Sequence, residues 1–279
     1  MVAELTKWRL SLAVAFSSVT GYLIFSGAAE SSLTLVASGV FLLSSGASAL
    51  NQFTERVSDA LMPRTAGRPL PSGRMTPHTA VAVAVVLLVS GSLLLAFSGR
   101  IPFFLGLFNV LLYNAIYTGL KKRTTLAIVP GALVGTIPPV IGYTAAGGAV
   151  TDTIILLFAL FMFLWQMPHF WLLLVRYGSE YEKAGIKTLY STMDGDKIRR
   201  LVFVWIVASS LALWILAGIF MPLPVIAGAL LLILNIAFIL LFRKIINLPE
   251  TDKRSKHAFI LINSFSILVM IVLIAVFNI

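Results

Sequence analysis

The feature that most constrains this chain is a series of apolar stretches, each long enough for a helix to cross a lipid bilayer. Such a helix needs roughly 20 consecutive apolar residues. Nine stretches predict an all-α integral membrane protein with nine transmembrane helices, and they cover residues 9–28, 33–55, 78–97, 101–120, 124–144, 152–175, 199–219, 222–242 and 258–278. No segment long enough for a soluble domain remains, so we expect a single transmembrane domain over residues 1–279. Because the first stretch begins within ten residues of the start, we expect no cleavable signal peptide.

The composition excludes most other classes of protein. Only 11% of the residues are charged and the mean hydropathy is +0.97, whereas soluble domains contain roughly 25% charged residues. A soluble globular protein and a disordered chain are therefore excluded. The chain has no cysteine, which rules out thiol catalysis, thiolate zinc sites, iron–sulfur clusters and covalent c-type haem attachment.

The basic residues fall on one side of the expected membrane. All of the 21 lysines and arginines except Arg100 lie at the N-terminal end or in the loops after the second, fourth, sixth and eighth stretches. Cytoplasmic loops carry such an excess of lysine and arginine. We therefore expect the N-terminus in the cytoplasm and the C-terminus outside, in the cell membrane of a bacterium or archaeon. Because topology accounts for the net charge of +10, we expect no nucleic-acid partner.

The loop after the second stretch contains the strongest candidate site. Asn51, Glu55 and Asp59 are spaced i, i+4 and i+8, so a helix would place their oxygen atoms on one face. Mg²⁺ is typically held by one or two carboxylates together with substrate phosphates. Arg64 and Arg68 follow directly, and their planar guanidinium groups suit phosphate oxygens. The pattern favours a metal and diphosphate site over the alternative, a solvated helix end with basic anchors.

This segment resembles a known family. The run from Asn51 to Asp59 and on through Arg68-Pro69-Leu70 resembles the first Asp-rich motif of the UbiA superfamily of intramembrane prenyltransferases, in the form found in its protoheme IX farnesyltransferase (haem O synthase) branch. Most superfamily members have aspartate where this chain has Glu55. The resemblance covers residues 10–275 and implies helices around a central cavity open to lipid.

The end of the fourth stretch carries a second part of the resemblance. Tyr113, Tyr117 and Lys121 would share one helix face, and Lys122 follows. The segment is similar to the family's Tyr-Thr-x-x-Leu-Lys-Arg element, which implies lysines at the diphosphate and phenol rings along the lipid tail or the porphyrin. An aromatic belt with basic anchors at the membrane interface is the alternative.

The fifth and sixth stretches contain two further elements. Gly131, Gly135 and Gly142 with the prolines at 138–139 resemble the family's Gly-x-x-x-Gly-x-x-Pro-Pro-x-x-Gly pattern, which either shapes a cavity or serves helix packing. Pro168-His169-Phe170 resembles the Pro-His-Phe element of haem O synthases. This implies that His169 ligates the haem iron or orients a substrate, with Phe170 beside it. A histidine satisfied by a backbone carbonyl is the alternative.

The loop after the sixth stretch resembles the Asp-Tyr-x-x-Ala-Gly-Ile element of haem O synthases, with Glu180 at the aspartate. The wider superfamily has a second Asp-rich motif here, with carboxylates at i and i+4, but position 184 is alanine. The resemblance implies Glu180 as a further metal ligand. Lys183 and Lys187 are spaced i, i+4 and would reach the diphosphate.

The resemblance implies a reaction between two membrane-dissolved substrates, farnesyl diphosphate and haem b, that yields haem O and diphosphate. Mg²⁺ is the implied cofactor, and a haem A synthase or a terminal oxidase is an implied downstream partner. The implied roles are metal binding by Asn51, Glu55, Asp59 and Glu180, stabilisation of the leaving group by Arg64, Arg68, Lys121 and Lys122, and stabilisation of an allylic cation by the aromatic rings of Tyr113, Tyr117 and Phe170.

Two alternatives remain. The first is another UbiA-type prenyltransferase that acts on an aromatic acid or quinone precursor; the Arg-Thr-x-x-Arg-Pro-Leu run from Arg64 and the Pro-His-Phe element disfavour it. The second is a transporter or a lipid- or haem-binding membrane protein without chemistry. The absence of acids deep within the stretches disfavours a proton-coupled pump.

Overall fold

Helices make up nearly all of the chain that the structure describes. The computed structural model describes residues 1–189, 193–220, 225–247 and 252–277, and within these ranges it contains no strand. The helices are α1 (Val2–Leu5), α2 (Trp8–Ser26), α3 (Ser31–Ala60), α4 (Pro63–Ala66), α5 (Pro77–Ser98), α6 (Arg100–Leu111), the π-helix η1 (Leu112–Tyr117), α7 (Thr118–Leu120), the 3₁₀ helix η2 (Thr125–Ala127), α8 (Ile128–Ala145), α9 (Thr153–Lys183), α10 (Gly195–Phe220), α11 (Val225–Ile246) and α12 (Asp252–Phe277).

Eight helical segments among the described residues are long and apolar enough to cross a membrane. They cover Trp8–Ser26, Ser31–Ala60, Pro77–Ser98, Arg100–Leu120, Thr125–Ala145, Thr153–Lys183, Gly195–Phe220 and Lys256–Phe277. The prediction of an all-α, multi-pass membrane protein is therefore confirmed. The expected stretch 222–242 corresponds to α11, but residues 222–224, like residue 278 of the last expected stretch, lie outside the described residues. The count of nine spans stays a prediction.

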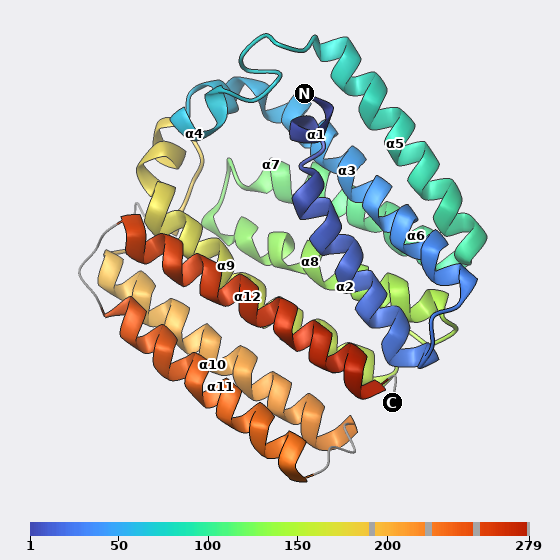
Figure 1. Cartoon of the computed structure of the whole chain (residues 1–279). Helices are drawn as coiled ribbons and strands as arrows, with labels where there is room; N and C mark the ends of the chain where they lie inside the picture. Colours follow the sequence, from blue (N-terminus) through green and yellow to red (C-terminus); the bar gives the residue numbers. More distant parts are fainter. Residues whose placement is uncertain (190–192, 221–224, 248–251, 278–279) are drawn as a thin grey trace.

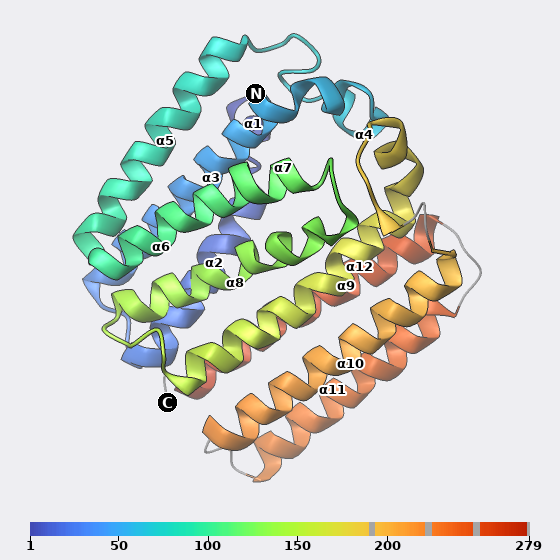
Figure 2. The ribbon, with the colours of Figure 1, turned by 180° about the vertical axis from the view of Figure 1, so that it is seen from behind.

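The long helices lie side by side, from α5 at one edge to α10 and α11 at the other (Figures 1 and 2). α3 packs against α2 and α5, α2 packs against α8 and α12, and α9 packs against α8, α10 and α12. The start of α2 and the end of α12 lie at opposite ends of the bundle (Figure 1).

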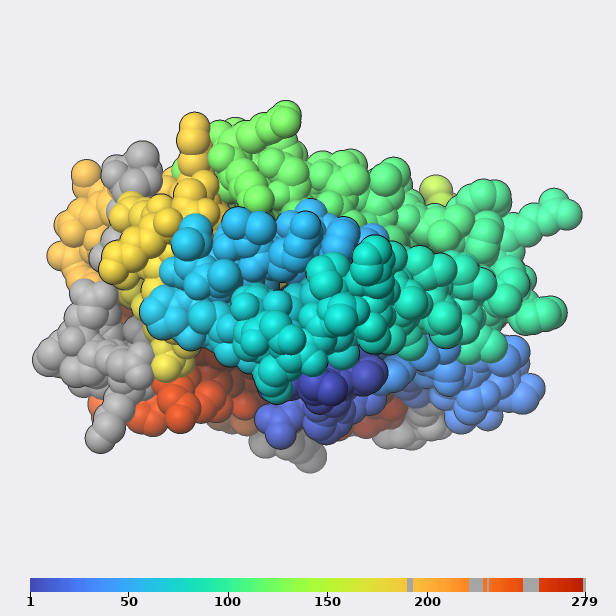
Figure 3. Space-filling view, turned by 90° about the horizontal axis from the view of Figure 1, so that it is seen from above, coloured from blue at the N-terminus to red at the C-terminus, as the bar shows by residue number. Residues whose placement is uncertain are grey.

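The loops that follow α3 and α9 meet at one end of the bundle. Figure 3, seen from that end, shows α4 beside the C-terminal end of α9. Met62 is buried in a small apolar cluster with Ala184 and Ile186, against which Tyr181 packs. Apolar packing thus brings together two segments that are more than a hundred residues apart in the sequence.

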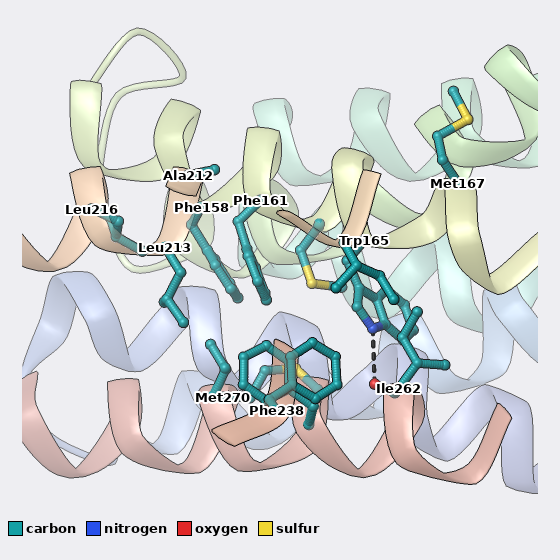
Figure 4. Packing of buried hydrophobic residues seen from close by; sticks show 14 of the residues in the cluster. Phe158, Phe161, Trp165, Met167, Ala212, Leu213, Leu216, Phe238, Ile262 and Met270 are labelled. Carbon is teal, nitrogen blue, oxygen red and sulfur yellow. Dashed lines mark hydrogen bonds between the residues drawn. The ribbon is translucent and has the colours of Figure 1, made fainter. Parts of the chain in front are cut away.

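An aromatic core joins α9 to the C-terminal helices. The rings of Phe158 and Phe161 stack with their centroids 6.3 Å apart, and both side chains are fully buried. Trp165 Nε1 donates a hydrogen bond of 2.9 Å to the carbonyl oxygen of Ile262 on α12, so its polar atom is satisfied inside the core (Figure 4). This packing fixes the orientation of α9, which also carries site residues described below.

Glycines allow α2 and α8 to touch at the end of the bundle away from the α3 and α9 loops. A Cβ added to Gly21 would collide with the backbone carbonyl of Pro139, and one added to Gly142 would collide with the carbonyl oxygen of Ser18. Small residues let helix backbones approach closely in membranes. The glycine and proline pattern of the fifth stretch therefore serves packing at Gly142, while Gly131 and Gly135 line a cavity.

We expect Gly142→Ala to destabilise the protein by about 1–3 kcal/mol, because the added methyl group forces two helix backbones apart. Gly218 on α10 is the matched control, since a Cβ added there meets nothing within 4 Å among the described residues. Gly218→Ala should be neutral or stabilising by up to about 1 kcal/mol through helix propensity. Thermal unfolding of both variants in detergent measures the difference, and equal unfolding temperatures would contradict the prediction.

Candidate active site

Two adjoining cavities lie between the helices. The first, of about 220 Å³, is bounded by the polar residues at the ends of α3 and α9. The second, of about 410 Å³, lies among α2, α3, α6, α8 and α9 and has a largely apolar wall. The side chains that border both cavities are Lys7, Arg64, Arg68, Tyr113, Tyr117, Phe170 and Leu173. The junction between a polar and an apolar space is therefore lined by cations and aromatic rings.

One face of α3 supplies the acidic wall of the first cavity. Asn51, Glu55 and Asp59 all line it, and their side chains are only 2%, 5% and 2% exposed. The helix continues without interruption to Ala60, so the i, i+4, i+8 spacing places the three on the same face. Burying two carboxylates is costly unless each is paired or ligates a metal.

Each of these carboxylates is paired with a cation. Arg68 Nη1 lies 2.7 Å from Asp59 Oδ2, and Lys121 Nζ forms an ion pair with Glu55 Oε1. Three of these four side chains are mostly buried and Arg68 is 23% exposed. The loop after α3 and the end of α7 thus both converge on α3.

The side chain of Asn51 is held by α7. Its Nδ2 donates a hydrogen bond of 3.1 Å to Thr118 Oγ1, and the Thr118 hydroxyl in turn donates to the carbonyl oxygen of Tyr113 at 2.8 Å. This second bond reaches back five residues, across the π-helix η1. A π-helix has a wider turn than an α-helix, and such turns often mark functional sites. With its nitrogen engaged, Asn51 directs its oxygen elsewhere, toward Lys7.

Aromatic rings form the wall at the cavity junction. Tyr113 and Tyr117 stack with centroids 5.9 Å apart, and Tyr117 lies 6.1 Å from Phe170 of α9. Gly131 makes room for this wall, because a Cβ there would come within 2.8 Å of the Tyr117 ring. The ammonium of Lys121 lies 5.6 Å from the Tyr117 ring centroid, a distance at which a cation is attracted to an aromatic face.

Arg64 is held between the two loops. Its guanidinium carbon lies 4.9 Å from the ring centroid of Tyr177, and its Nη2 donates a hydrogen bond of 3.3 Å to Tyr181 Oη. The backbone N–H of Arg64 donates to Glu180 Oε2 at 3.4 Å. These contacts fix Arg64 at the wall of both cavities.

Lys7, between α1 and α2, also reaches the site. Its Nζ donates a hydrogen bond of 3.4 Å to Asn51 Oδ1. Burial, together with the positive charges of Arg68 and Lys121, lowers the pKa of Lys7 to about 7, while Glu55 and Asp59 act in the opposite direction. The first residues of the chain therefore contribute to this cavity.

The second cavity has an aliphatic floor and a polar, aromatic flank. Val40 of α3 lines it, about 16 Å deeper than Asn51 at 1.5 Å per residue. On the flank, Gln166 and His169 line the cavity, and the ring centroid of His169 lies 4.7 Å from that of Phe259. The Nδ1 of the imidazole has no hydrogen-bond partner among the described residues.

The comparison with known families explains this arrangement. The model of the UbiA prenyltransferase family matches residues 13–277, nearly the whole chain. The chain belongs to the UbiA prenyltransferase family. It is 46% identical to the protoheme IX farnesyltransferase of Geobacter sulfurreducens over 64% of this chain and 66% of that protein. It is 42% identical to the protein of that name from Cytophaga hutchinsonii over 69% and 68%, and 35% identical to that from Nitratidesulfovibrio vulgaris over 76% and 74%.

Solved UbiA structures have the same fold. A UbiA homolog from Aeropyrum pernix K1 superposes with a TM-score of 0.76 at 18% identity, over 94% of this chain and 98% of that one. A UbiA homolog from Archaeoglobus fulgidus bound to GPP and Mg²⁺ gives a TM-score of 0.71 at 14% identity, over 99% of both chains. The likeness confirms the expected UbiA-like architecture.

Most of the site residues predicted from the sequence line one or both of the two cavities, and three line neither. Nine line the first cavity: Asn51, Glu55, Asp59, Arg64, Arg68, Tyr113, Tyr117, Lys121 and Lys187. His169 lines the second and Phe170 both. Glu180, Lys122 and Lys183 border neither cavity, and no three His, Cys, Asp or Glu residues of the described chain form a group that could hold a metal.

Several residues that line the two cavities, or that hold a residue lining them, were not predicted from the sequence. Lys7 and Tyr181 border the first cavity and Gln166 the second, and Thr118 holds Asn51. A lysine beside the first span is expected as a membrane anchor, so Lys7 gives no distinct signal. Gln166 does give a signal in the sequence. It is a polar side chain within a span, three residues before His169 and therefore on the same helix face.

Proposed function

We propose that the protein transfers a farnesyl group from farnesyl diphosphate to a vinyl group of haem b, giving haem O and diphosphate. The bond between the allylic carbon and the diphosphate oxygen breaks, the vinyl group attacks the allylic carbon, and water adds to the resulting cation with loss of a proton. The observation that carries the proposal is the two-part cavity, whose polar end with Glu55 and Asp59 continues into an apolar chamber. The names of the relatives support it.

The donor set on α3 fits Mg²⁺. Asn51, Glu55 and Asp59 offer oxygen atoms, which hard divalent cations prefer, and all three are buried against the cavity. A metal held by the carboxylates would take the place of Lys121 and Arg68, which pair with them here. When bound, Mg²⁺ supplies charge neutralisation to the diphosphate. Glu180 is proposed as a further ligand; it approaches the site through the backbone of Arg64.

The basic residues stabilise the charge that the leaving diphosphate gains. Arg64 is positioned by its contact with Tyr181, and Arg68 and Lys121 lie beside Asp59 and Glu55, next to the place that the metal and the diphosphate would occupy. Preorganised cations in a water-poor site lower the barrier because they need no rearrangement as charge develops. Lys187 borders the same cavity, and Lys122 and Lys183 are proposed to contribute from its rim.

The apolar chamber protects the allylic cation and separates the two substrates. The rings of Tyr113, Tyr117 and Phe170 face the junction and attract a cation. We assign the farnesyl tail to the aliphatic floor near Val40 and the porphyrin to the flank with His169, where the unpartnered Nδ1 suits a haem substrate. The haem propionates would face the basic end of the bundle.

The topology follows from the same assignment. We place the N-terminus in the cytoplasm and the C-terminus outside, in a bacterial or archaeal cell membrane, with residues 1–279 acting as one domain. The opposite placement of the start of α2 and the end of α12 supports this (Figure 1). A haem A synthase or terminal oxidase is the proposed recipient of the product.

We expect the purified protein to convert haem b and farnesyl diphosphate to farnesylated haem in the presence of Mg²⁺, measured by mass analysis of the extracted pigments. Chelation of Mg²⁺ should stop the reaction. Prenylation of a phenolic acid without any farnesylated haem would instead establish the other UbiA-type activity. Transport of a substrate without any product would exclude both enzymatic assignments.

A further inference from the structure

The segment before α2 is fastened to α3 beside the metal-binding face. Gln52 Nε2 donates hydrogen bonds to the carbonyl oxygens of Glu4 and Leu5, at 2.8 and 3.0 Å. Leu5 is fully buried, in one apolar cluster with Ala49 of α3 and the start of α5. Figure 3 shows this N-terminal segment lying against the residues that begin α5. Gln52 directly follows Asn51, so the same turn of α3 holds the segment and faces the cavity.

This attachment directs Lys7 into the site at a conformational cost. The backbone of Lys7 has φ 48° and ψ 47°, and it is the one non-glycine residue with positive φ in the described chain. A left-handed conformation costs a non-glycine residue roughly 1–2 kcal/mol, and it persists where the surroundings impose it. Here it turns the chain between α1 and α2 so that the ammonium of Lys7 points at Asn51.

Lys7, like Arg64, has no ion pair with a carboxylate among the described residues. Glu55 pairs with Lys121 and Asp59 with Arg68, whereas among the described residues Lys7 has only the amide oxygen of Asn51. Positive charge is therefore in excess at the point where the two cavities meet, since Lys7, Arg64 and Arg68 border both. An ammonium group in such surroundings is stabilised by an anion.

We propose that Lys7 binds the diphosphate at the junction of the two cavities, and that Gln52 is a positioning residue that holds the Lys7 segment in place. The inference rests on the proposed function for the identity of the anion. The junction is where the head of a prenyl diphosphate meets its tail, so Lys7 lies at the end of the diphosphate from which the allylic carbon departs. Lys7 and Gln52 together make the N-terminal segment part of the active site.

The test measures binding of inorganic diphosphate with Mg²⁺ to the purified full-length protein by calorimetry. Lys7→Met should weaken binding by about ten- to a hundredfold, the usual range for a lost hydrogen bond to a charged group, and Lys7→Arg should retain most of it. Arg9→Met is the matched control: Arg9 is exposed, two residues further along, and borders neither cavity. It should bind diphosphate as the unaltered protein does.

A double-mutant cycle tests Gln52. Gln52→Met should weaken diphosphate binding when Lys7 is present and add nothing in the Lys7→Met background, because Gln52 acts only through Lys7. Equal and additive losses would overturn the positioning role. A general structural effect would also lower the unfolding temperature of Lys7→Met, which we expect to stay close to that of Arg9→Met.

The outcomes separate this inference from the proposed function. Diphosphate binding that is the same in Lys7→Met as in the unaltered protein would overturn the inference even if farnesylated haem is formed. Weakened binding in Lys7→Met but not in Arg9→Met supports the inference even if the prenyl acceptor proves to be a molecule other than haem. Absence of diphosphate binding in the unaltered protein would overturn both.

Discussion

Asp59→Asn and Glu55→Gln are each expected to reduce farnesyl transfer by about a thousandfold or more while leaving the protein folded. Both changes keep the size and one oxygen atom of the side chain and remove the negative charge that a divalent cation requires. Loss of one preorganised electrostatic contact typically costs about 10²–10³ in rate, and loss of a metal ligand also removes the charge neutralisation that the metal supplies. Both residues are nearly fully buried, and among the described residues no other carboxylate lines the first cavity to replace them.

Initial rates across a range of Mg²⁺ concentrations measure this prediction. The concentration of Mg²⁺ needed for half-maximal activity should rise in both variants, which a loss of folded protein alone would not cause. Glu182→Gln is the control, because Glu182 is an exposed carboxylate at the same end of the bundle and should leave the rate unchanged. Near-normal rates in both Asp59→Asn and Glu55→Gln would refute the metal assignment.

The part of the fold and site that sequence could predict is the part encoded by short-range periodicity. Stretches of apolar residues predict the helices, because each must satisfy its backbone groups within itself in lipid. The acidic face of α3 follows in the same way from the spacing of Asn51, Glu55 and Asp59, since α3 continues as a helix to Ala60. The family resemblance then supplied the farnesyl group and the acceptor.

Contacts between distant segments could not be predicted this way. Lys7 meets Asn51 across 44 residues, and the contact depends on a left-handed backbone turn that has no marker at a lysine. The π-helix η1 is likewise invisible in the pattern around Tyr113 and Tyr117, although it is what lets Thr118 reach both Tyr113 and Asn51. The contact of Glu180 is another such case, because its carboxylate accepts a hydrogen bond from the backbone N–H of Arg64, more than a hundred residues earlier in the chain.

Arg68→Met is expected to lower both activity and stability. Arg68 borders both cavities, so its loss removes one of the cations that stabilise the leaving diphosphate, at a cost of about 10²–10³ in rate. It also leaves Asp59, which is 2% exposed, without its partner at 2.7 Å. Stranding a buried charge usually costs about 3–5 kcal/mol. We expect about 3 kcal/mol, because the site is partly open to water where Arg68 is exposed.

The double variant Asp59→Asn/Arg68→Met separates the two effects. It removes both charges, so the penalty for a stranded carboxylate disappears and the unfolding temperature should recover, while farnesyl transfer stays abolished because the metal ligand and the phosphate contact are both missing. Arg56→Met is the control, since Arg56 lies on α3 like Asp59, packs over Phe53 and borders neither cavity. A double variant as unstable as Arg68→Met would show that the ion pair with Asp59 does not account for the loss of stability. Full activity in Arg68→Met would remove Arg68 from the diphosphate site.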